Sequence, residues 1–462
     1  MKKRQFTRAA RCAACCALSV VLAASLGGCA AASASSASDA ASASDVAVTS
    51  AAASAATDDL SAYDLEYSNR DLDASYDATR ATYITLADNA SSAETYAHES
   101  ANGVSISGND VTITQAGTYV LSGNLTDGCV FVNIDEEEKC QLVLNGVSMS
   151  NSDGPCIYVM AADKTFITLA DGTQNTLVDG ADYVLDEEEE PTATIFSKDD
   201  LTLNGTGTLN ITGNYRHAVR SKDDLVITGG TYVINAVEDA LSGKDCLKIC
   251  DGIFDITCGE DALKSSNDSE EGRGFVAIDG GDFTISAGDD AVHAETLMRI
   301  TAGTVNILTC YEGYEGAVVR IDGGTTSIVA SDDGINAASG SSSEGGMPMG
   351  GEGRGGAGGP GAGAGAVPGD AGATTSTCRV VVTGGTTYVS AGGDGIDSNG
   401  SVEVSGGVLI VEGPTSNAGS FFDYDSSATI TGGTVLMVGS TGMAQSFTGG
   451  TQAFAMASAS GS

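Results

Sequence analysis

The chain has 462 residues, and its 61 acidic residues outnumber 21 Lys and Arg residues to give a net charge of −40 at pH 7. An acidic excess of this size repels phosphate, so it excludes nucleic acid as a partner, and it is compatible with bound cations. Only three histidines are present, which argues against a metal site built on histidine.

The first 28 residues are typical of an exported protein. They carry five basic residues and no acid, followed by an apolar run that is too short for a membrane-spanning helix. Leu26-Gly27-Gly28-Cys29 fits a bacterial lipobox, in which Cys29 is acylated and becomes the new amino terminus. The alternative is an ordinary signal peptide with a chance cysteine. We predict a signal peptide at 1–28 and attachment to the outer face of the cell membrane through lipid on Cys29 alone.

Two segments separate this leader from the main domain. Residues 29–57 are almost entirely Ala, Ser, Thr and Asp, which predicts a flexible tether with too little apolar bulk to fold. Residues 58–99 have a mixed composition with several tyrosines, and we expect them to cap the first coil of the domain that follows. Without the five leader bases the net charge becomes −40 − 5 = −45.

A repeat organises residues 100–438. Short alternating apolar runs, Gly-Gly turns and one recurring phrase return at offsets such as 240 − 218 = 22 and 262 − 240 = 22. The phrases are Ala218-Val219-Arg220, Asp239-Ala240-Leu241, Asp261-Ala262-Leu263, Asp290-Ala291-Val292, Asp333-Gly334-Ile335 and Asp394-Gly395-Ile396. We predict an all-β fold, a right-handed parallel β-helix with about 22 residues per coil. An antiparallel β-sandwich also has many short strands, but its turns would not keep an acid at one phase of every repeat.

Two segments depart from the repeat. Residues 338–376 form a Gly-rich, Ser-rich and Ala-rich tract with three prolines, which predicts a disordered insertion extruded from one coil. The phrase resumes at Asp394, so the tract is not expected to be a domain boundary. Residues 439–462 are polar and predict a frayed C-terminal tail.

The feature that carries chemistry is a set of acids at one phase of the repeat. The predicted metal ligands are Glu238, Asp239, Glu260, Asp261, Asp289, Asp290, Asp332, Asp333, Asp394 and Asp397. Stacked parallel strands would place neighbouring carboxylates roughly 5 Å apart, where each pair repels by about 1 to 3 kcal/mol. Calcium would relieve this repulsion because it takes six to eight oxygen ligands in variable geometry. Alternatively, the acids serve only as turn residues that bond their own backbone.

Three positions past each acid lies a second set of polar and partly basic residues. This set comprises Arg220, Ser242, Lys264, His293, Asn336 and Asp397. Among these residues we predict that Lys264, His293 and Asn336 contact a ligand directly.

The lipobox, the Ala/Ser tether, the Ser-Lys-Asp-Asp-Leu phrases at 197–201 and 221–225 and the repeated acid phrases resemble the bacterial calcium-associated carbohydrate-binding β-helix lipoproteins. The resemblance spans roughly residues 100–438. It implies a pectate-lyase-like fold and binding of acidic, pectin-like polysaccharide.

A polyanion cannot approach so acidic a surface unless cations bridge the two, so the charge also favours an acidic polysaccharide bound through calcium. A calcium-dependent polysaccharide lyase is one alternative, with Lys264, Arg220 or Arg299 as the base. A surface adhesin or structural stalk without enzymatic activity is another. In each case we expect a monomer.

Overall fold

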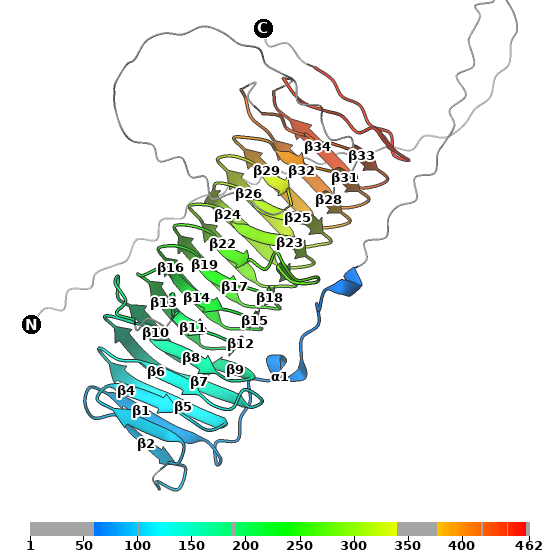
Figure 1. The fold of residues 1–462 in the computed structure, drawn as a ribbon. Coiled ribbons are helices and arrows are strands. Elements are labelled where there is room, and N and C mark those ends of the chain that lie inside the picture. The colour runs from blue at the N-terminus through cyan, green and yellow to red at the C-terminus, as the bar shows by residue number, and fades with distance from the viewer. Residues whose placement is uncertain are drawn as a thin grey trace, which may run out of the picture. The chain divides into compact units, whose positions relative to one another are not determined.

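The structure is a computed structural model that describes residues 60–99, 101–185, 190–339, 377–416, 419–440 and 442–458. Within these ranges almost every element is a β-strand and most pairings are parallel, which confirms the predicted all-β parallel β-helix (Figure 1). The predicted signal peptide, Cys29 and the tether lie outside the described residues, as does nearly all of the Gly-rich insertion. None of the helices that the structure describes is long and apolar enough to cross a membrane.

The strands form three stacks, and each coil contributes one strand to each stack. Stack 1 contains β4 (Asp110–Ile113), β6 (Val130–Asn133), β8 (Ile157–Ala161), β11 (Ala193–Ser197), β14 (His217–Ser221), β17 (Leu241–Gly243), β20 (Leu263–Ser265), β27 (Ile335–Ala337) and β30 (Ile396–Ser398). Stack 2 contains β9 (Lys164–Leu169), β12 (Asp200–Gly205), β15 (Asp224–Ile227), β18 (Cys246–Ile249), β21 (Phe275–Ile278), β28 (Arg379–Val382), β31 (Ser401–Val404), β33 (Ser427–Ile430) and β35 (Gly449–Gly450).

Stack 3 contains β10 (Gln174–Asp179), β13 (Thr208–Gly213), β16 (Thr231–Ala236), β19 (Ile253–Cys258), β22 (Asp282–Ser286), β24 (Thr304–Cys310), β26 (Thr325–Ala330), β29 (Thr386–Ala391), β32 (Val408–Glu412) and β34 (Thr434–Val438). Four longer strands bend from one stack into the next. They are β5 (Gly117–Leu125), β7 (Lys139–Asn151), β23 (Val292–Ile300) and β25 (Tyr314–Ile321).

The register between coils reproduces the repeat. Val219 pairs with Leu241, and Leu241 pairs with Leu263, at offsets of 241 − 219 = 22 and 263 − 241 = 22. Because each side chain lies above its counterpart in the previous coil, one sequence phase becomes one straight row on the molecule. The strands on either side of the Gly-rich segment, β27 and β28, both pair with β25.

The core runs along the inside of the coils. Inward side chains alternate with outward ones, as in the burial of β19, where Phe254 and Ile256 are buried and their neighbours are exposed. The rings of Tyr232, Phe254 and Phe283 stack with centroids 5.1 Å and 4.5 Å apart. At the turn before Tyr232, Gly230 has a φ of 110°, and a Cβ there would lie 2.8 Å from the Tyr232 hydroxyl, so this turn requires glycine.

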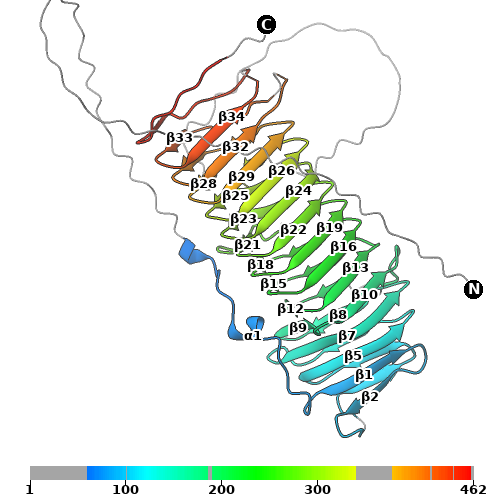
Figure 2. The same cartoon turned by 180° about the vertical axis from the view of Figure 1, so that it is seen from behind.

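The N-terminal end of the β-helix is covered by antiparallel pairs. β1 (Thr82–Ala87) pairs with β2 (Ser92–Thr95) and in parallel with β5, while β3 (Val104–Ser107) pairs with β4. The residues before β1 extend much further than a cap of the first coil. Residues 60–76, here called the strap, contain a 3-10 turn at Leu60–Ala62 and helix α1 (Asn69–Leu72), and run along the outer side of stack 2 (Figure 2).

Buried polar contacts hold the strap. The Asp71 carboxylate is 3% exposed and lies 2.9 Å from Lys164 Nζ, and it accepts a hydrogen bond from the Thr202 hydroxyl at 2.6 Å. Lys248 Nζ donates to the Asp64 and Glu66 carbonyls at 3.1 and 2.8 Å. The strap therefore contacts coils that follow it by well over a hundred residues.

Candidate functional site

The predicted acids lie at the corner where stack 3 passes into stack 1, and they form three parallel rows. The acid row contains Asp239, Asp261, Asp290, Glu312, Asp333 and Asp394. The rim row, one residue earlier in the chain, contains Glu238, Glu260, Asp289, Tyr311 and Asp332. The face row, three residues after the acid row, contains Arg220, Ser242, Lys264, His293, Glu315, Asn336 and Asp397.

The acid row is tied into the backbone of the corner. Asp261 Oδ1 accepts a hydrogen bond from the Asp290 amide at 2.9 Å, and Asp333 Oδ1 accepts one from the Asp394 amide at 2.6 Å. Each of these carboxylates thus satisfies an amide in the next coil, which is the structural role that turn aspartates have elsewhere. The amide occupies only one oxygen of each carboxylate, so this role does not by itself exclude cation binding.

The expected phrase did not predict one coil of the acid row. The phrase Glu312-Gly313-Tyr314-Glu315 replaces the expected acid, small residue and aliphatic residue, yet it keeps the period because 312 − 290 = 22 and 333 − 312 = 21. Its strand pairs in register on both sides, with His293 opposite Glu315 and Glu315 opposite Asn336. The spacing alone would have found these two glutamates and the neighbouring Tyr311.

In the N-terminal half of the rows, basic side chains neutralise the acids. Lys264 Nζ lies 2.7 Å from Asp261 Oδ2 and 3.7 Å from Asp239 Oδ1, and both carboxylates are 3% exposed. His217 Nδ1 lies 3.2 Å from Asp239 Oδ2. Burial alone would raise the pKa of Asp239, but His217 and Lys264 outweigh it and hold that pKa below its usual value. Burial would lower the pKa of Lys264, and the two aspartates raise it instead.

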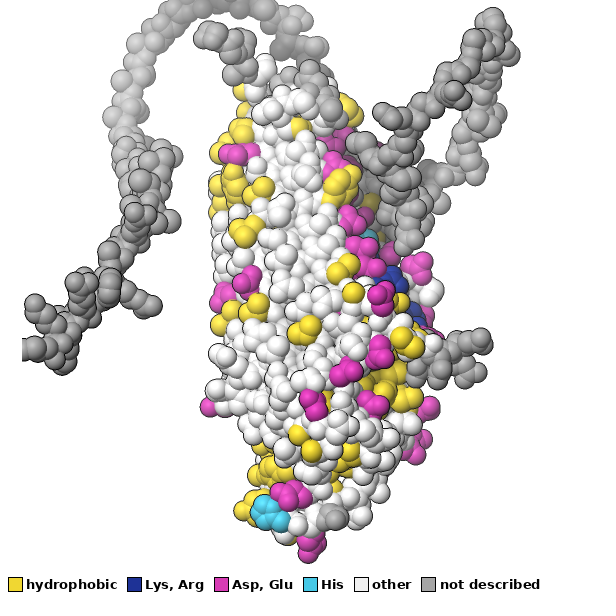
Figure 3. All heavy atoms as spheres, turned by 90° about the vertical axis from the view of Figure 1, so that its left-hand side faces the viewer, with side chains coloured by type: hydrophobic (Ala, Val, Ile, Leu, Met, Phe, Trp, Pro, Cys, Tyr) yellow, Lys and Arg dark blue, Asp and Glu magenta, His cyan; other side chains and the backbone are white. Residues whose placement is uncertain are grey.

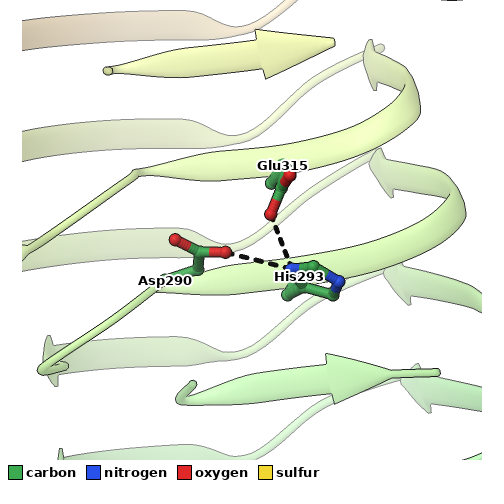
Figure 4. Close-up of side chains that lie close together, drawn as sticks. All are labelled: Asp290, His293 and Glu315. Atoms are coloured by element: carbon green, nitrogen blue, oxygen red, sulfur yellow. Dashed lines mark hydrogen bonds and ion pairs between the residues drawn. The ribbon is translucent and has the colours of Figure 1, made fainter. Parts of the chain in front are cut away.

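At the middle of the rows, His293 bridges two acids (Figure 4). Its Nδ1 lies 3.0 Å from Asp290 Oδ2 and 2.6 Å from Glu315 Oε2, and its Nε2 lies 3.6 Å from Glu295. Burial opposes the imidazolium, but these carboxylates prevail and raise the pKa of His293 to about 12. Burial raises the pKa of Asp290, whereas the hydrogen bond to His293 lowers that of Glu315. This group is internally neutralised by its own histidine.

In the C-terminal half, three aspartates lie together, and the part of the chain that the structure describes places no counter-charge beside them. Carboxylate oxygens of Asp333, Asp394 and Asp397 lie within 4.8 Å of one another. Among the described residues no basic side chain forms an ion pair with any of the three. Burial, followed by repulsion from neighbouring aspartates, raises the pKa of Asp333 to about 7 and that of Asp397 to about 6. The arrangement favours a proton or a cation at this place.

Asn336 adds an amide oxygen beside this group. The side chain is 9% exposed, and its Nδ2 donates to Glu312 Oε2 at 2.8 Å, while its Oδ1 is buried without a hydrogen-bond partner in the described part of the chain. Asn336 pairs in register with Asp397, so both side chains leave the same side of adjacent strands. A buried carbonyl oxygen without a donor is costly unless something positive lies near it.

The rim row faces solvent. Glu260 and Asp289 are exposed, Glu238 and Asp332 are half-buried, and Arg216 Nε donates to Glu238 at 2.5 Å. Asp289 also approaches Asp261 and Asp290 with oxygens within 4.8 Å. Figure 3 shows acidic side chains following one another along one side of the molecule, with hydrophobic side chains between them.

Each of the three predicted lyase bases already has an ion-pair or hydrogen-bond partner. Lys264 is held between two aspartates, as described above. Arg220 lies in the face row with its guanidinium 2.8 Å from His217 Nε2. Arg299 lies on a different face, in the stack 2 part of β23, 3.4 Å from Asp279 and 3.5 Å from Asp322.

The fold and the rows define an acidic parallel β-helix protein that carries stacked carboxylates along one edge. Residues 107–356, more than half of the chain, match the family described as carbohydrate-binding domain-containing proteins, and the chain belongs to that family.

A curated relative of the same description from Acetivibrio thermocellus is 37% identical over 140 residues, which are 30% of this chain and 49% of the relative. The chain thus spans about half the length of the curated relative it matches. A solved structure, the polysaccharide lyase-like protein from C. thermocellum in its gadolinium derivative, is 32% identical and covers 53% of this chain and 93% of its own, with a TM-score of 0.46.

Proposed function

We propose that this protein binds an acidic, pectin-like polysaccharide through calcium held by the C-terminal half of the acid and face rows. The observation that carries the proposal is the group of Asp333, Asp394 and Asp397, three carboxylates that converge within 4.8 Å without a basic partner among the described residues. Family membership supports carbohydrate as the ligand class.

The residues present suit calcium. The donor set is oxygen only, with three carboxylates and the unpartnered Oδ1 of Asn336, and Glu312 lies beside them. Calcium takes such hard oxygen ligands at variable geometry, whereas zinc prefers nitrogen and sulfur. The N-terminal half fits a cation poorly, because Lys264 and His217 already occupy the space between its carboxylates.

Bound calcium would neutralise the carboxylates and offer its remaining positions to uronate oxygens. The protein's own contribution is to hold Asp394 in the turn before β30, Asp397 on β30 itself and Asp333 in the preceding coil, with their carboxylates already close together. The acidic charge of the chain, −40, makes such neutralisation necessary before a polyanion can approach.

Calorimetric titration with polygalacturonate, in calcium and again in EDTA, tests this function. We expect binding in calcium only, with no unsaturated product detected by absorbance. Binding that persists in EDTA would contradict the calcium requirement. Absence of binding in both buffers would leave an adhesin or a structural stalk as the better description.

We also propose that the protein is anchored to the cell surface by lipid on Cys29, within the sequence Leu26-Gly27-Gly28-Cys29. Metabolic labelling with an alkyne fatty acid should label the unchanged protein and fail to label Cys29→Ser. Label on the Cys29→Ser protein would refute this attachment.

A further inference from the structure

The rim row carries one aromatic residue among its acids. Tyr311 lies between Asp289 and Asp332 in the backbone ladder, with its amide 2.8 Å from the Asp289 carbonyl and its carbonyl 2.9 Å from the Asp332 amide. Its side chain is 47% exposed.

Two exposed aliphatic residues lie on neighbouring strands of stack 3, Leu308 just before this tyrosine and Val329 in the next coil. β24 contains an extra residue relative to both neighbours, because Ile307 and Cys310 on β24 pair with Ile328 and Ala330 on β26. Leu308 and Thr309 therefore oppose Val329 alone, which is the geometry of a β-bulge, and bulges redirect side chains next to functional sites. Leu308 is 52% exposed and Val329 is 45% exposed.

We propose that Tyr311, with Leu308 and Val329, forms a platform for the apolar face of a sugar ring whose charged edge lies toward Asp333, Asp394 and Asp397. A pyranose has a ring face made of C–H groups and an edge made of oxygens. A binding site for it therefore needs an apolar surface next to polar ligands. The bulge supplies the apolar surface, and Asp332, whose amide donates to the Tyr311 carbonyl, is followed directly by Asp333.

This inference rests on the proposed function and assigns the residues that position the sugar. Tyr96 is also exposed, at 58%, but it lies just past β2 at the N-terminal end, far along the chain from the uncompensated acids. The platform and the unpaired carboxylates occur in consecutive coils, which favours a uronate ring as their common occupant. A neutral ring would use the platform without needing the carboxylates.

Because the chain contains no tryptophan, a single substitution creates a unique fluorescent reporter. In the full-length protein, Tyr311→Trp should retain binding of polygalacturonate in calcium, and its emission should shift when the polysaccharide is added. Tyr96→Trp, the matched control, should show no shift. Equal emission changes in both variants, or a change in neither while polygalacturonate binds, would overturn the platform.

Affinity provides a second test. Tyr311→Ala should weaken polygalacturonate binding by about three- to tenfold, and Tyr311→Phe by less, since the ring is retained. Calcium affinity without polysaccharide should be the same in all three proteins. If Tyr311→Ala loses as much affinity for calcium as for polygalacturonate, the tyrosine only orients Asp332. That result would overturn the platform. Failure of the unchanged protein to bind polygalacturonate would refute the proposed function itself, whereas normal binding by Tyr311→Ala refutes the platform alone.

Discussion

The two halves of the acid row have the same backbone register and differ in what neutralises their carboxylates. Around Asp239 and Asp261, Lys264 and His217 lie within ion-pair distance, and burial is nearly complete. Around Asp333 and Asp394 the described residues offer no cation, and the pKa of Asp333 rises to about 7. The repeat thus fixes where an acid lies, while the face-row residue of the same coil or of the next one determines whether that acid has a basic partner.

The side chains of the face row account for this difference between the two halves. Lys264 and Asn336 occupy the same position in coils of the two halves. A lysine at this position places a positive charge between the carboxylates, whereas an asparagine adds an amide oxygen beside them. Substitutions at this position therefore separate a structural acid row from one that binds cations.

The largest effect is expected where an internal cation is removed. Lys264→Met leaves Asp239 and Asp261 buried without their ammonium partner and should lower the free energy of unfolding by about 3 kcal/mol. Chemical denaturation in EDTA measures this loss. The control Lys222→Met breaks an exposed pair with Glu190 and should change stability by less than about 0.5 kcal/mol. A similarly small loss for Lys264→Met would show that the N-terminal half does not depend on its lysine.

Removal of the uncompensated carboxylates should abolish cation binding. We expect calcium at one hundred times its dissociation constant to stabilise the unchanged protein by about 2.7 kcal/mol. The combined variant Asp333→Asn, Asp394→Asn and Asp397→Asn should lose this stabilisation. The matched control changes three acids of the rim row, Glu238→Gln, Glu260→Gln and Asp289→Asn, and should keep it. Thermal unfolding with and without calcium distinguishes them, and equal losses in both variants would place the ion elsewhere.

The metal-free protein should lose stability as pH rises. Asp397 and Asp333 have folded-state pKa values of about 6 and about 7, above the ordinary value of 3.8. The native state therefore retains protons that the unfolded state has released. Their stabilising effect is complete below about pH 4 and is lost as pH rises through 6 and 7, on the order of 2 kcal/mol after allowance for solvent screening.

This pH dependence is measured by denaturation in EDTA across that range. Saturating calcium should flatten the curve, because the ion replaces the protons. If the stability in EDTA instead rises between pH 5 and pH 7, and rises equally in the unchanged protein and in the triple asparagine variant, Asp333 and Asp397 are not the groups that cause the pH dependence.

The smallest effect is expected when one face-row residue of the C-terminal half is replaced by its counterpart from the N-terminal half. Asn336→Lys places an ammonium at the face-row position that Lys264 holds in the N-terminal half. It should abolish the calcium response while stabilising the metal-free protein by only about 1 kcal/mol, since the attraction to the carboxylates is offset by the loss of hydration of the ammonium at a buried position. Calcium titration followed by thermal unfolding measures both changes. Asn336→Gln, which keeps an amide oxygen, is the control and should retain a response to calcium.

Much of the architecture was predictable from sequence because one residue phase maps onto one row in a parallel β-helix. The phrases around Ala218, Ala240 and Ala262 were sufficient to predict the period, and the acids that precede Ala240, Ala262 and Ala291 were sufficient to predict the row. The coil at Glu312 was not, because Tyr314 and the glutamates departed from the expected phrase although their spacing did not. The division of the rows into neutralised and uncompensated halves depends on ion pairs between coils, which periodicity does not encode. The route of the strap could not be predicted from the sequence either, because residues 60–76 carry no repeat and the residues they contact lie far along the chain.

The strap changes how such a fold comes apart. A coil contacts mainly its two neighbours, so a solenoid normally frays from its ends one coil at a time. Here the Tyr67 hydroxyl donates to Asp279 at 3.1 Å, and Thr202 donates to Asp71, so the first coils are joined to ones formed much later in the sequence. Such contacts close large loops and form late in folding. Because these contacts join the strap to several coils at once, we expect the N-terminal coils to unfold as one cooperative unit, after the strap has been released.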